Sequence, residues 1–337
     1  MDQQDIDQLM NCKELQESNG QLSLIQTHIS WVILTDKHAY KIKKPVDFIF
    51  LDFSTLEKRK HYCKREVELN KRLAADMYLQ SIPIYKKNDT YSFVNPEGEI
   101  IDYAVLMNRM DTSKEMDKLL LNNQVTEREI EKLAKKIADF HQQSTVIKKA
   151  IDINAIKIRF NDIEEVLKSV ISPVAESFYP VIREAIEISN RFLDKHQLYI
   201  KERASKGFVR DVHGDLHMGN IFLYEEPVIF DCIEFNDQLR EMDILDEIAF
   251  LGMDLDAYGR KDLSEHLYKI YLQYSGNQES IETGLLFKYF KYYRANIRAK
   301  VYLLNALEMS DPILYQEKIK SAERYIDLIK QYAREFH

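Results

Sequence analysis

The hydrophobic and polar residues of this chain follow one pattern in the first third and another in the rest. Up to about residue 107, short apolar runs are separated by turn-forming residues, which is typical of β-strands. Beyond Met107, apolar residues recur at helical spacing, as in Ile130, Leu133, Ile137 and Phe140. The pattern therefore predicts a strand-rich N-terminal part followed by a larger helical part.

The N-terminal part is expected to form a sheet with one main helix. Asn95-Pro96-Glu97-Gly98 predicts a turn between two strands. Ser54-Thr55-Leu56-Glu57 has the spacing of a capping box and predicts a helix that runs to about Leu73. The expected strands are 22–25, 31–34, 39–43, 92–94 and 103–107.

The rest of the chain is expected to be helical. Thr126-Glu127-Arg128-Glu129 is a second capping box. Long helices are predicted over 154–170, 174–200 and most of 241–335, with breaks near Tyr258-Gly259, Ser275-Gly276-Asn277 and Asp311-Pro312. We therefore expect an α+β fold of two lobes, 1–107 and 108–337, with a hinge near Asn108-Arg109-Met110.

The most informative motif is His213-Gly214-Asp215-Leu216-His217-Met218-Gly219-Asn220, which is followed across a short hairpin by Asp231. Transfer of a phosphoryl group from Mg-ATP needs an Asp that orients the attacking hydroxyl and accepts its proton. It also needs an Asn and a second Asp that hold the metal. The five-residue offset from Asp215 to Asn220 equals that of the protein-kinase catalytic loop.

This motif resembles the catalytic signature of the aminoglycoside phosphotransferase and choline kinase superfamily. A second stretch, from Thr27 to Val32 and on through Ala39 to Arg59, is similar to a bacterial subfamily of uncharacterised members. The resemblance implies a protein-kinase-like two-lobed fold and an ATP-dependent, magnesium-dependent kinase acting on a hydroxyl of a small molecule. Some members carry a second, P-loop kinase domain, whose G-x-x-x-x-G-K-[ST] motif does not occur in this sequence.

Within that frame, the N-terminal lobe should supply a lysine for the nucleotide phosphates and a helix glutamate that holds it. Lys41 is the first choice and Lys43 is the competitor, because residues two apart on a strand share a face. Glu66 is the expected partner and Glu68 the alternative. Backbone groups from Leu106 to Arg109, with Met107 among them, are expected to meet the adenine. The glycine-rich phosphate loop is absent, and Gln26-Thr27-His28-Ile29-Ser30 stands in its place.

Other polar residues are expected to support the loop or to meet the acceptor. His213 and His217 are predicted to hold the loop, and the resemblance implies that Asp246, before Ile248-Ala249, braces it. Several acidic residues after Asp231 either form a solvated face or, with Glu234 among them, line a pocket for a cationic acceptor. Arg294 and Arg298, at i and i+4, either bind an anionic acceptor or pair with those acids.

Rival interpretations of the motif are weaker. A metallophosphoesterase needs metal ligands from several separated strand ends, whereas here the candidate ligands fall on one short segment. His213 and His217 would bind zinc together only on a helix, which Gly214 and Gly219 disfavour. A degenerate kinase that binds nucleotide without turnover, and an enzyme that phosphorylates or nucleotidylates proteins, both stay open.

Composition narrows the class of protein. The net charge of -8 and pI near 5.7 disfavour a nucleic-acid binder. Three widely spaced cysteines predict neither a disulfide framework nor a zinc cluster. Neither a targeting segment nor a membrane span is evident, so the cytoplasm is the expected compartment. The acceptor, the purine preference and the oligomeric state are not determined by the sequence.

Overall fold

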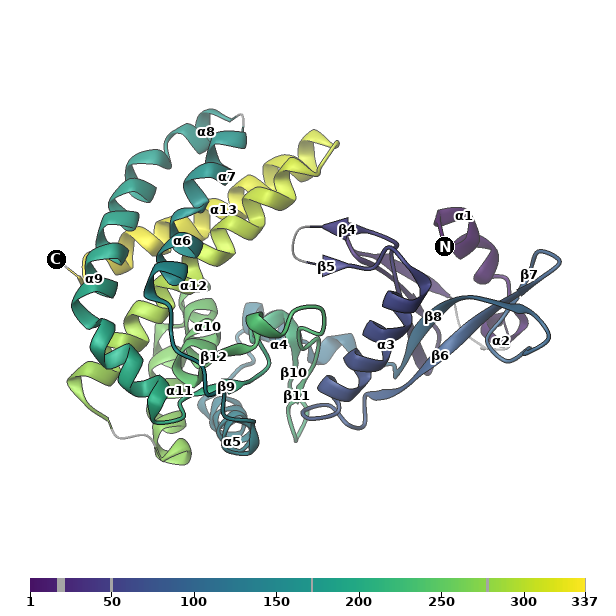
Figure 1. Cartoon of the computed structure of the whole chain (residues 1–337), viewed down its shortest axis with the longest axis horizontal. Helices are drawn as coiled ribbons and strands as arrows, with labels where there is room; N and C mark the ends of the chain where they lie inside the picture. Colours follow the sequence, from purple (N-terminus) through teal and green to yellow (C-terminus); the bar gives the residue numbers. More distant parts are fainter. Residues whose placement is uncertain (17–21, 49–50, 171, 277–278, 337) are drawn as a thin grey trace. The chain divides into compact units, whose positions relative to one another are not determined.

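The computed structural model describes residues 1–16, 22–48, 51–170, 172–276 and 279–336 (Figure 1). The chain forms two compact units. Unit 1 consists of Met1–Leu119 and Gly219–Arg240, and unit 2 of Leu120–Met218 and Glu241–His337. We predicted a nucleotide-binding lobe before residue 108 and a catalytic lobe after residue 107. These functional assignments stay a prediction.

Unit 1 is built around a six-stranded antiparallel sheet with strand order β1-β2-β3-β8-β6-β7. Residues of opposite parity on a strand point to opposite faces. On β3, Ile42 faces a core shared with Ile6 and Leu9 of helix α1, whereas Ala39 faces a core shared with Val67 of helix α3. The bounds are β1 Ser23–Gln26, β2 Ser30–Leu34, β3 His38–Lys43, β6 Tyr78–Lys87, β7 Thr90–Ser92, β8 Glu99–Asn108, α1 Gln3–Leu9 and α3 Leu56–Asn70.

The register of β3 decides where its lysines point. Lys41 and Lys43 have the parity of Ala39, so they lie on the face of the sheet that α3 covers. Helix α3 packs against β8 and β6 on that face. A charged side chain beneath a packed helix needs a charged partner, which predicts ion pairs between β3 and α3.

The structure of this unit differs from the sequence predictions in three respects. Strand β6 was not expected, because Tyr78–Lys87 contains Pro83, which normally argues against a central strand. The predicted hairpin between 92–94 and 103–107 is replaced by pairing of β6 with both β7 and β8. The N-cap of α3 is Thr55, whose hydroxyl accepts from the Lys58 N–H at 3.3 Å, and not Ser54.

The remaining elements assigned to unit 1 are short. The hairpin of β10 and β11 matters most for the site, because it lies between two motif residues in the sequence. Helix α4 crosses the boundary between the units. The bounds are α2 Lys13–Gln16, β4 Asp47–Phe48, β5 Leu51–Asp52, η1 Thr112–Lys114, α4 Met116–Leu121, η2 Met218–Asn220, β10 Ile221–Phe222, β11 Val228–Ile229 and η3 Asp237–Leu239.

Unit 2 is mainly helical, with α10 at its centre. Every residue of α10 from Ile244 to Leu255 is buried. It packs against α11 and α12, and α12 packs along α13. Strand β9 directly precedes the motif loop, and it pairs with β12, which follows the loop in the sequence. The bounds are α5 Glu127–Gln143, α6 Ile153–Asn161, α7 Ile163–Ser169, α8 Pro173–Glu176, α9 Tyr179–Ser205, β9 Val209–Asp211, β12 Glu241–Asp243, α10 Ile244–Ala257, α11 Lys261–Ser275, α12 Ile281–Leu307 and α13 Pro312–Ala333.

The helix boundaries follow the breaks seen in the sequence. Gly259 and Gly276 both adopt positive φ, at 77° and 67°, and separate the helices of the C-terminal part. Pro312 opens α13, and the Thr126 N–H donates to the Glu129 carboxylate at 3.0 Å as a capping box requires. The predicted helix over 154–170 is divided at Asp162. The α+β class with a sheet-containing N-terminal part and a helical remainder is confirmed.

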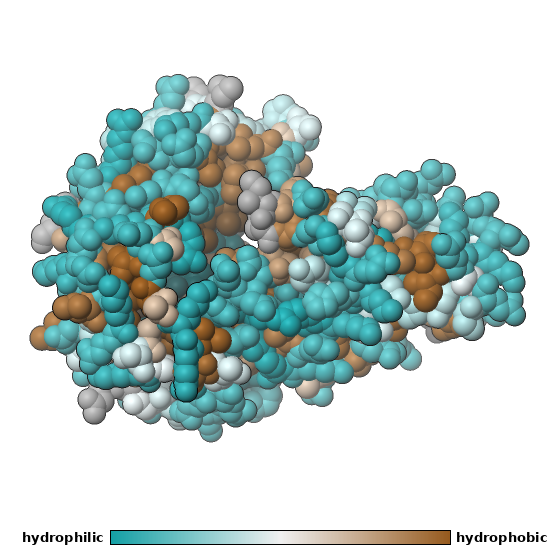
Figure 2. Space-filling model, viewed as in Figure 1, coloured by the Kyte–Doolittle hydropathy of each residue, from teal (hydrophilic) through white to brown (hydrophobic). Residues whose placement is uncertain are grey.

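The surface is mostly hydrophilic, as expected when the apolar residues are buried in the cores. On the face drawn in Figure 2, hydrophilic residues cover most of the surface and apolar residues gather in separate small groups. Among the residues that the structure describes, no helix combines the length and apolarity needed to cross a membrane.

Candidate active site

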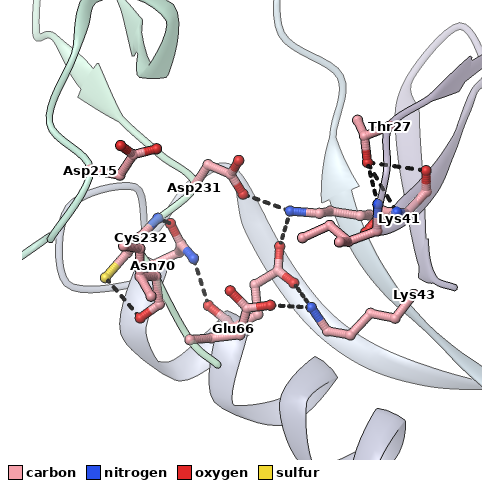
Figure 3. Close-up of polar contacts among 12 residues, drawn as sticks. Thr27, Lys41, Lys43, Glu66, Asn70, Asp215, Asp231 and Cys232 are labelled. Atoms are coloured by element: carbon pink, nitrogen blue, oxygen red, sulfur yellow. Dashed lines mark hydrogen bonds and ion pairs between the residues drawn. The ribbon is translucent and has the colours of Figure 1, made fainter. Parts of the chain in front are cut away.

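The centre of the unit 1 site is the carboxylate of Glu66, which receives a lysine on each oxygen. Lys41 Nζ lies 2.8 Å from Glu66 Oε1, and Lys43 Nζ lies 2.6 Å from Oε2 (Figure 3). Glu66 is completely buried, whereas Glu68, the alternative partner, is exposed. Burial by itself would raise the pKa of Glu66, but the two ammonium groups lower it to about 2.

The two lysines differ in their surroundings. Lys43 is fully buried, lies 4.7 Å from the Phe53 ring centroid and forms a second ion pair with Glu234. Lys41 retains 13% of its side-chain exposure and contacts Asp231 Oδ1 at 2.6 Å. Burial would lower the pKa of Lys41, but Asp231 and Glu66 raise it well above its ordinary value. Of the two lysines, Lys41 is therefore the one whose side chain is accessible, and Lys43 is enclosed in the interior of unit 1.

Asp231 is held by its backbone. Its φ of 63° is in the left-handed region, and its N–H donates to the Tyr78 hydroxyl at 3.2 Å. The next N–H, of Cys232, donates to Asn70 Oδ1 at 2.9 Å, and Asn70 Nδ2 donates to the Glu66 carbonyl at 2.9 Å. The same turn of α3 therefore fixes both the lysine partner and the segment that carries Asp231.

Asn220 lies at the same end of the β10–β11 hairpin as Asp231. The Asn220 carbonyl accepts from the Phe230 N–H at 3.0 Å, so the residues just before β10 and just after β11 are neighbours. An amide and a carboxylate are the hard oxygen donors that Mg²⁺ prefers, and such sites often use only one or two protein ligands together with phosphates. The Lys41 ammonium on Asp231 shows that this carboxylate accommodates a cation. The donor set therefore fits magnesium.

The other residues of unit 1 with a predicted ligand role make internal contacts, and their role toward a nucleotide stays a prediction. Thr27 closes the β1–β2 turn: its hydroxyl accepts from the Ser30 N–H at 3.0 Å. Met107 is buried in β8. Arg109 follows β8 and donates to the Thr35 carbonyl at 2.7 Å. Among the described residues, no group of three or more His, Cys, Asp or Glu has metal-site geometry.

The motif loop of unit 2 presents Asp215. Gly214, with φ 91°, makes the turn that precedes it. The Asp215 N–H donates to His213 Nδ1 at 3.3 Å, and Asp215 Oδ2 lies 3.4 Å from His217 Nε2. The Asp215 side chain is 38% exposed, so its carboxylate is accessible to a substrate. Burial would raise the pKa of Asp215, but His217, Arg298 and His213 hold it well below its ordinary range.

Two acids of α10 fix the ends of this loop. Glu247 Oε1 accepts from the N–H groups of His213 and Gly214 at 2.8 and 2.7 Å. Asp254 Oδ2 accepts from the Met218 N–H at 3.0 Å. The two acids are seven positions apart and therefore share a helix face. The sequence signal that could have identified these two loop-binding residues is the seven-residue spacing of acidic residues in an otherwise apolar helix.

The prediction that Asp246 contacts the loop is corrected by these distances. Asp246 pairs with Arg294, whose Nε lies 2.6 Å from Oδ1. Successive helix residues point about 100° apart, so Asp246 faces α12 while Glu247 faces the loop. Sequence reasoning also missed His141 of α5, whose Nε2 lies 2.6 Å from Glu247 Oε2.

The remaining predicted acceptor residues have distinct environments. Glu234 is buried against Lys43 in unit 1. In unit 2, Arg294 is used by Asp246, whereas Arg298 contacts a tyrosine hydroxyl and aromatic rings. The structure therefore groups Lys41, Lys43, Glu66, Asp231 and Glu234 in unit 1, and Asp215, His213, His217 and Arg298 in unit 2.

Comparison of the sequence with known proteins identifies relatives without a described activity. No protein-family model matches the chain. Uncharacterised proteins of Mycobacterium tuberculosis and Mycobacterium bovis are each 32% identical over 280 residues, which is 82% of this chain and 53% of the relative. The chain thus spans about half the length of the curated relatives it matches.

Comparison with solved structures identifies the fold. A choline/ethanolamine kinase family protein from Mesorhizobium loti has a TM-score of 0.54 at 12% identity, covering 98% of this chain and 97% of the other. A choline kinase from Cryptosporidium parvum has a TM-score of 0.57 at 11% identity, covering 98% and 94%. An aminoglycoside 2'-phosphotransferase in complex with GDP has a TM-score of 0.53 at 10% identity, covering 97% and 99%. The expected protein-kinase-like fold of this superfamily is therefore confirmed.

Proposed function

We propose that this chain, which has the fold of choline kinases and aminoglycoside phosphotransferases, is an ATP-dependent phosphotransferase acting on a hydroxyl of a small molecule. The observation that carries the proposal is the position of Lys41 on both Glu66 and Asp231, at 2.8 and 2.6 Å. Protein kinases use this combination of a strand lysine, a helix glutamate and a metal-binding aspartate for phosphoryl transfer. The structural neighbours are named as kinases of choline, ethanolamine and aminoglycosides, which supports the same reaction class.

In unit 1, Lys41 would bind phosphate oxygens of ATP while Glu66 keeps its ammonium in place. Asn220 and Asp231 would hold magnesium, which supplies positive charge that offsets the charge developing on the phosphates. Backbone groups near Met107 and Arg109 would bind the adenine.

In unit 2, Asp215 would orient the acceptor hydroxyl. As the hydroxyl oxygen bonds to the γ-phosphorus, the bond from phosphorus to the ADP oxygen breaks and Asp215 accepts the hydroxyl proton. The depressed pKa of Asp215 keeps it ionised and therefore able to accept a hydrogen bond from the hydroxyl. His213, His217 and Glu247 hold the loop without taking part in proton transfer.

The first test is thermal unfolding with and without saturating Mg-ATP, for the natural chain and for Asp231→Ala. At a concentration about 100 times the dissociation constant, the nucleotide should stabilise the folded protein by about 2.7 kcal/mol. We expect this in the natural chain and a much smaller effect in the variant. An absent response in both proteins contradicts the phosphate role of Lys41 and the metal role of Asp231.

A second measurement separates this reaction from its rivals. Mass spectrometry of the product distinguishes a phosphoryl addition from an adenylyl addition, and a small-molecule product from a modified protein. Nucleotide binding without any transferred group, across neutral, cationic and anionic acceptors, would favour a nucleotide-binding module without turnover.

A further inference from the structure

Arg298 of α12 is a half-buried cation without a carboxylate partner. Its Nη2–H donates to the Tyr302 hydroxyl at 3.1 Å, and its Cζ lies 5.1, 5.7 and 6.0 Å from the ring centroids of Tyr302, Tyr325 and Phe250. Within the described part of the chain, no carboxylate oxygen lies within ion-pair distance of Arg298, and its buried Nε has no hydrogen-bond partner. A guanidinium so placed has unused donors.

The neighbouring cations of α12 are paired. Lys291 Nζ lies 2.7 Å from Asp256 Oδ2, and Arg294 Nε lies 2.6 Å from Asp246 Oδ1. Asp254, the acid with the largest electrostatic effect on Arg298, already accepts from the Met218 N–H and from the Tyr325 hydroxyl at 3.0 and 2.8 Å. Lys291 and Arg294 therefore have carboxylate partners within the unit, whereas Arg298 keeps N–H donors without an acceptor.

Arg298 lies beside the motif loop. The Phe250 ring centroid is 6.0 Å from Arg298 Cζ and 5.7 Å from the centroid of the His217 ring. His217 in turn lies 3.4 Å from the Asp215 carboxylate. The charge of Arg298 also helps to lower the pKa of Asp215, without an ion pair between the two side chains. Arg298 is also partly accessible to solvent, unlike Arg294.

We propose that Arg298 binds an anionic group, a phosphate or a carboxylate, of the acceptor whose hydroxyl is oriented by Asp215. This inference rests on the proposed function and names its substrate class. A guanidinium presents a planar fork of donors that matches either anion, and charge-assisted hydrogen bonds of this kind are stronger than neutral ones. Burying the fork without an anion is costly, and a bound anion offsets that cost.

The same geometry excludes a cationic group at this position. Three aromatic rings around one point normally form a site for an ammonium group. Here Phe250, Tyr302 and Tyr325 already surround the cation of Arg298. A substrate ammonium would meet a like charge in a partly dehydrated site, which is unfavourable. The acceptor class therefore differs from the amines named for the choline and ethanolamine kinases of the same fold.

The first experiment measures anion binding and does not need the acceptor. Inorganic phosphate is titrated into the natural chain in the presence of Mg-ADP, and the arginine Nε–Hε signals are followed by NMR. The Arg298 signal is assigned by its loss in Arg298→Lys. We expect a saturable shift of this signal with a dissociation constant in the millimolar range, and no shift with glucosamine. Acetate in a parallel titration distinguishes carboxylate from phosphate preference.

Matched variants separate a local effect from a general one. Arg183→Gln removes a surface arginine that pairs with Glu164 and should leave the titration unchanged. Arg298→Gln should abolish saturable binding. An Arg298 signal that does not move at tens of millimolar phosphate overturns the inference, and this result needs only the natural chain and the assignment variant.

The second experiment measures turnover with a polyol, its monophosphate, its aldonate and its amino counterpart, by ADP release. An anionic member should exceed the neutral one by about 10- to 100-fold in kcat/KM, as expected for one charge-assisted hydrogen bond. That preference should fall to near unity in Arg298→Gln. A preference for the amino member would overturn the inference.

The two proposals fail in different ways. Mg-ATP that does not stabilise the natural chain contradicts the proposed function. Mg-ATP that binds normally, with no phosphate effect at Arg298, contradicts the substrate class alone.

Discussion

His141 and Glu247 are joined by a buried contact of 2.6 Å between Nε2 and Oε2, and this contact connects α5 and α10 beneath the loop of Asp215. The other ring nitrogen of His141 lies 2.7 Å from the Tyr271 hydroxyl of α11. His141 therefore links Tyr271 of α11 to the Glu247 carboxylate of α10. The other oxygen of that carboxylate accepts from the His213 and Gly214 N–H groups. The position of the loop depends on the helical core of unit 2.

Replacing Glu247 should weaken this connection. Glu247→Gln keeps the shape but removes the charge facing His141, so we expect a loss of about 1–3 kcal/mol in the free energy of unfolding. Turnover should fall while Mg-ATP affinity is retained, because the loop is affected and unit 1 is not. Urea unfolding and steady-state kinetics measure both effects. Glu187→Gln, at an exposed position of α9, is the matched control and should stay within about 0.5 kcal/mol of the natural chain.

Replacing Lys41 or Lys43 by Met should have different effects on stability and on Mg-ATP affinity. Lys41→Met leaves Glu66 paired with Lys43, so stability should change little while Mg-ATP affinity falls by about 10- to 100-fold. Lys43→Met leaves Glu66 and Glu234 close together and without the buried cation between them, which should cost about 3–5 kcal/mol of stability. Calorimetric binding and urea unfolding distinguish the two. A larger loss of ATP affinity from a folded Lys43→Met protein would reverse the assignment.

Low pH should reduce the free energy of unfolding, because the buried carboxylate of Glu66 becomes protonated. The lysines lower its pKa from an ordinary 4.5 to about 2 in the folded state, so the folded form binds its proton less readily than the unfolded form. The resulting stabilisation is complete above pH 4.5 and is lost as the pH falls toward 2. Unfolding free energies measured across this window should therefore converge for the natural chain and Glu66→Gln. A constant difference would show that Glu66 acts through packing rather than charge.

Asp215→Asn should separate chemistry from nucleotide binding. The amide retains the shape but cannot accept the proton, so turnover should fall by about 10²–10⁴-fold. Mg-ATP affinity should stay nearly unchanged, because the proposed phosphate contacts come from unit 1. Single-turnover kinetics with each acceptor that the natural chain phosphorylates, together with calorimetry, provide the check. Unchanged turnover would remove Asp215 from the mechanism.

Local patterns predicted much of the fold. Four local signals predicted helix ends correctly: the capping box at Thr126, the glycines Gly259 and Gly276, and Pro312. Each of these signals acts on its own backbone or on residues close to it in the sequence. Strand β6 was missed because Pro83 and its polar residues argue against a strand locally. Its pairing with β7 and β8 supplies hydrogen bonds that local propensity does not reveal.

The sequence by itself determined the candidate chemistry, since the spacing of Asp215, Asn220 and Asp231 is a property of one continuous segment. Which side chains lie together around these residues depends on the tertiary structure. Lys43 differs from Lys41 in having a second ion pair with Glu234. Glu247 contacts the motif loop and Asp246 contacts Arg294, because the two neighbouring residues point in different directions from α10. Both differences depend on which face of a strand or helix is buried and against what, and that follows from packing between segments far apart in the chain.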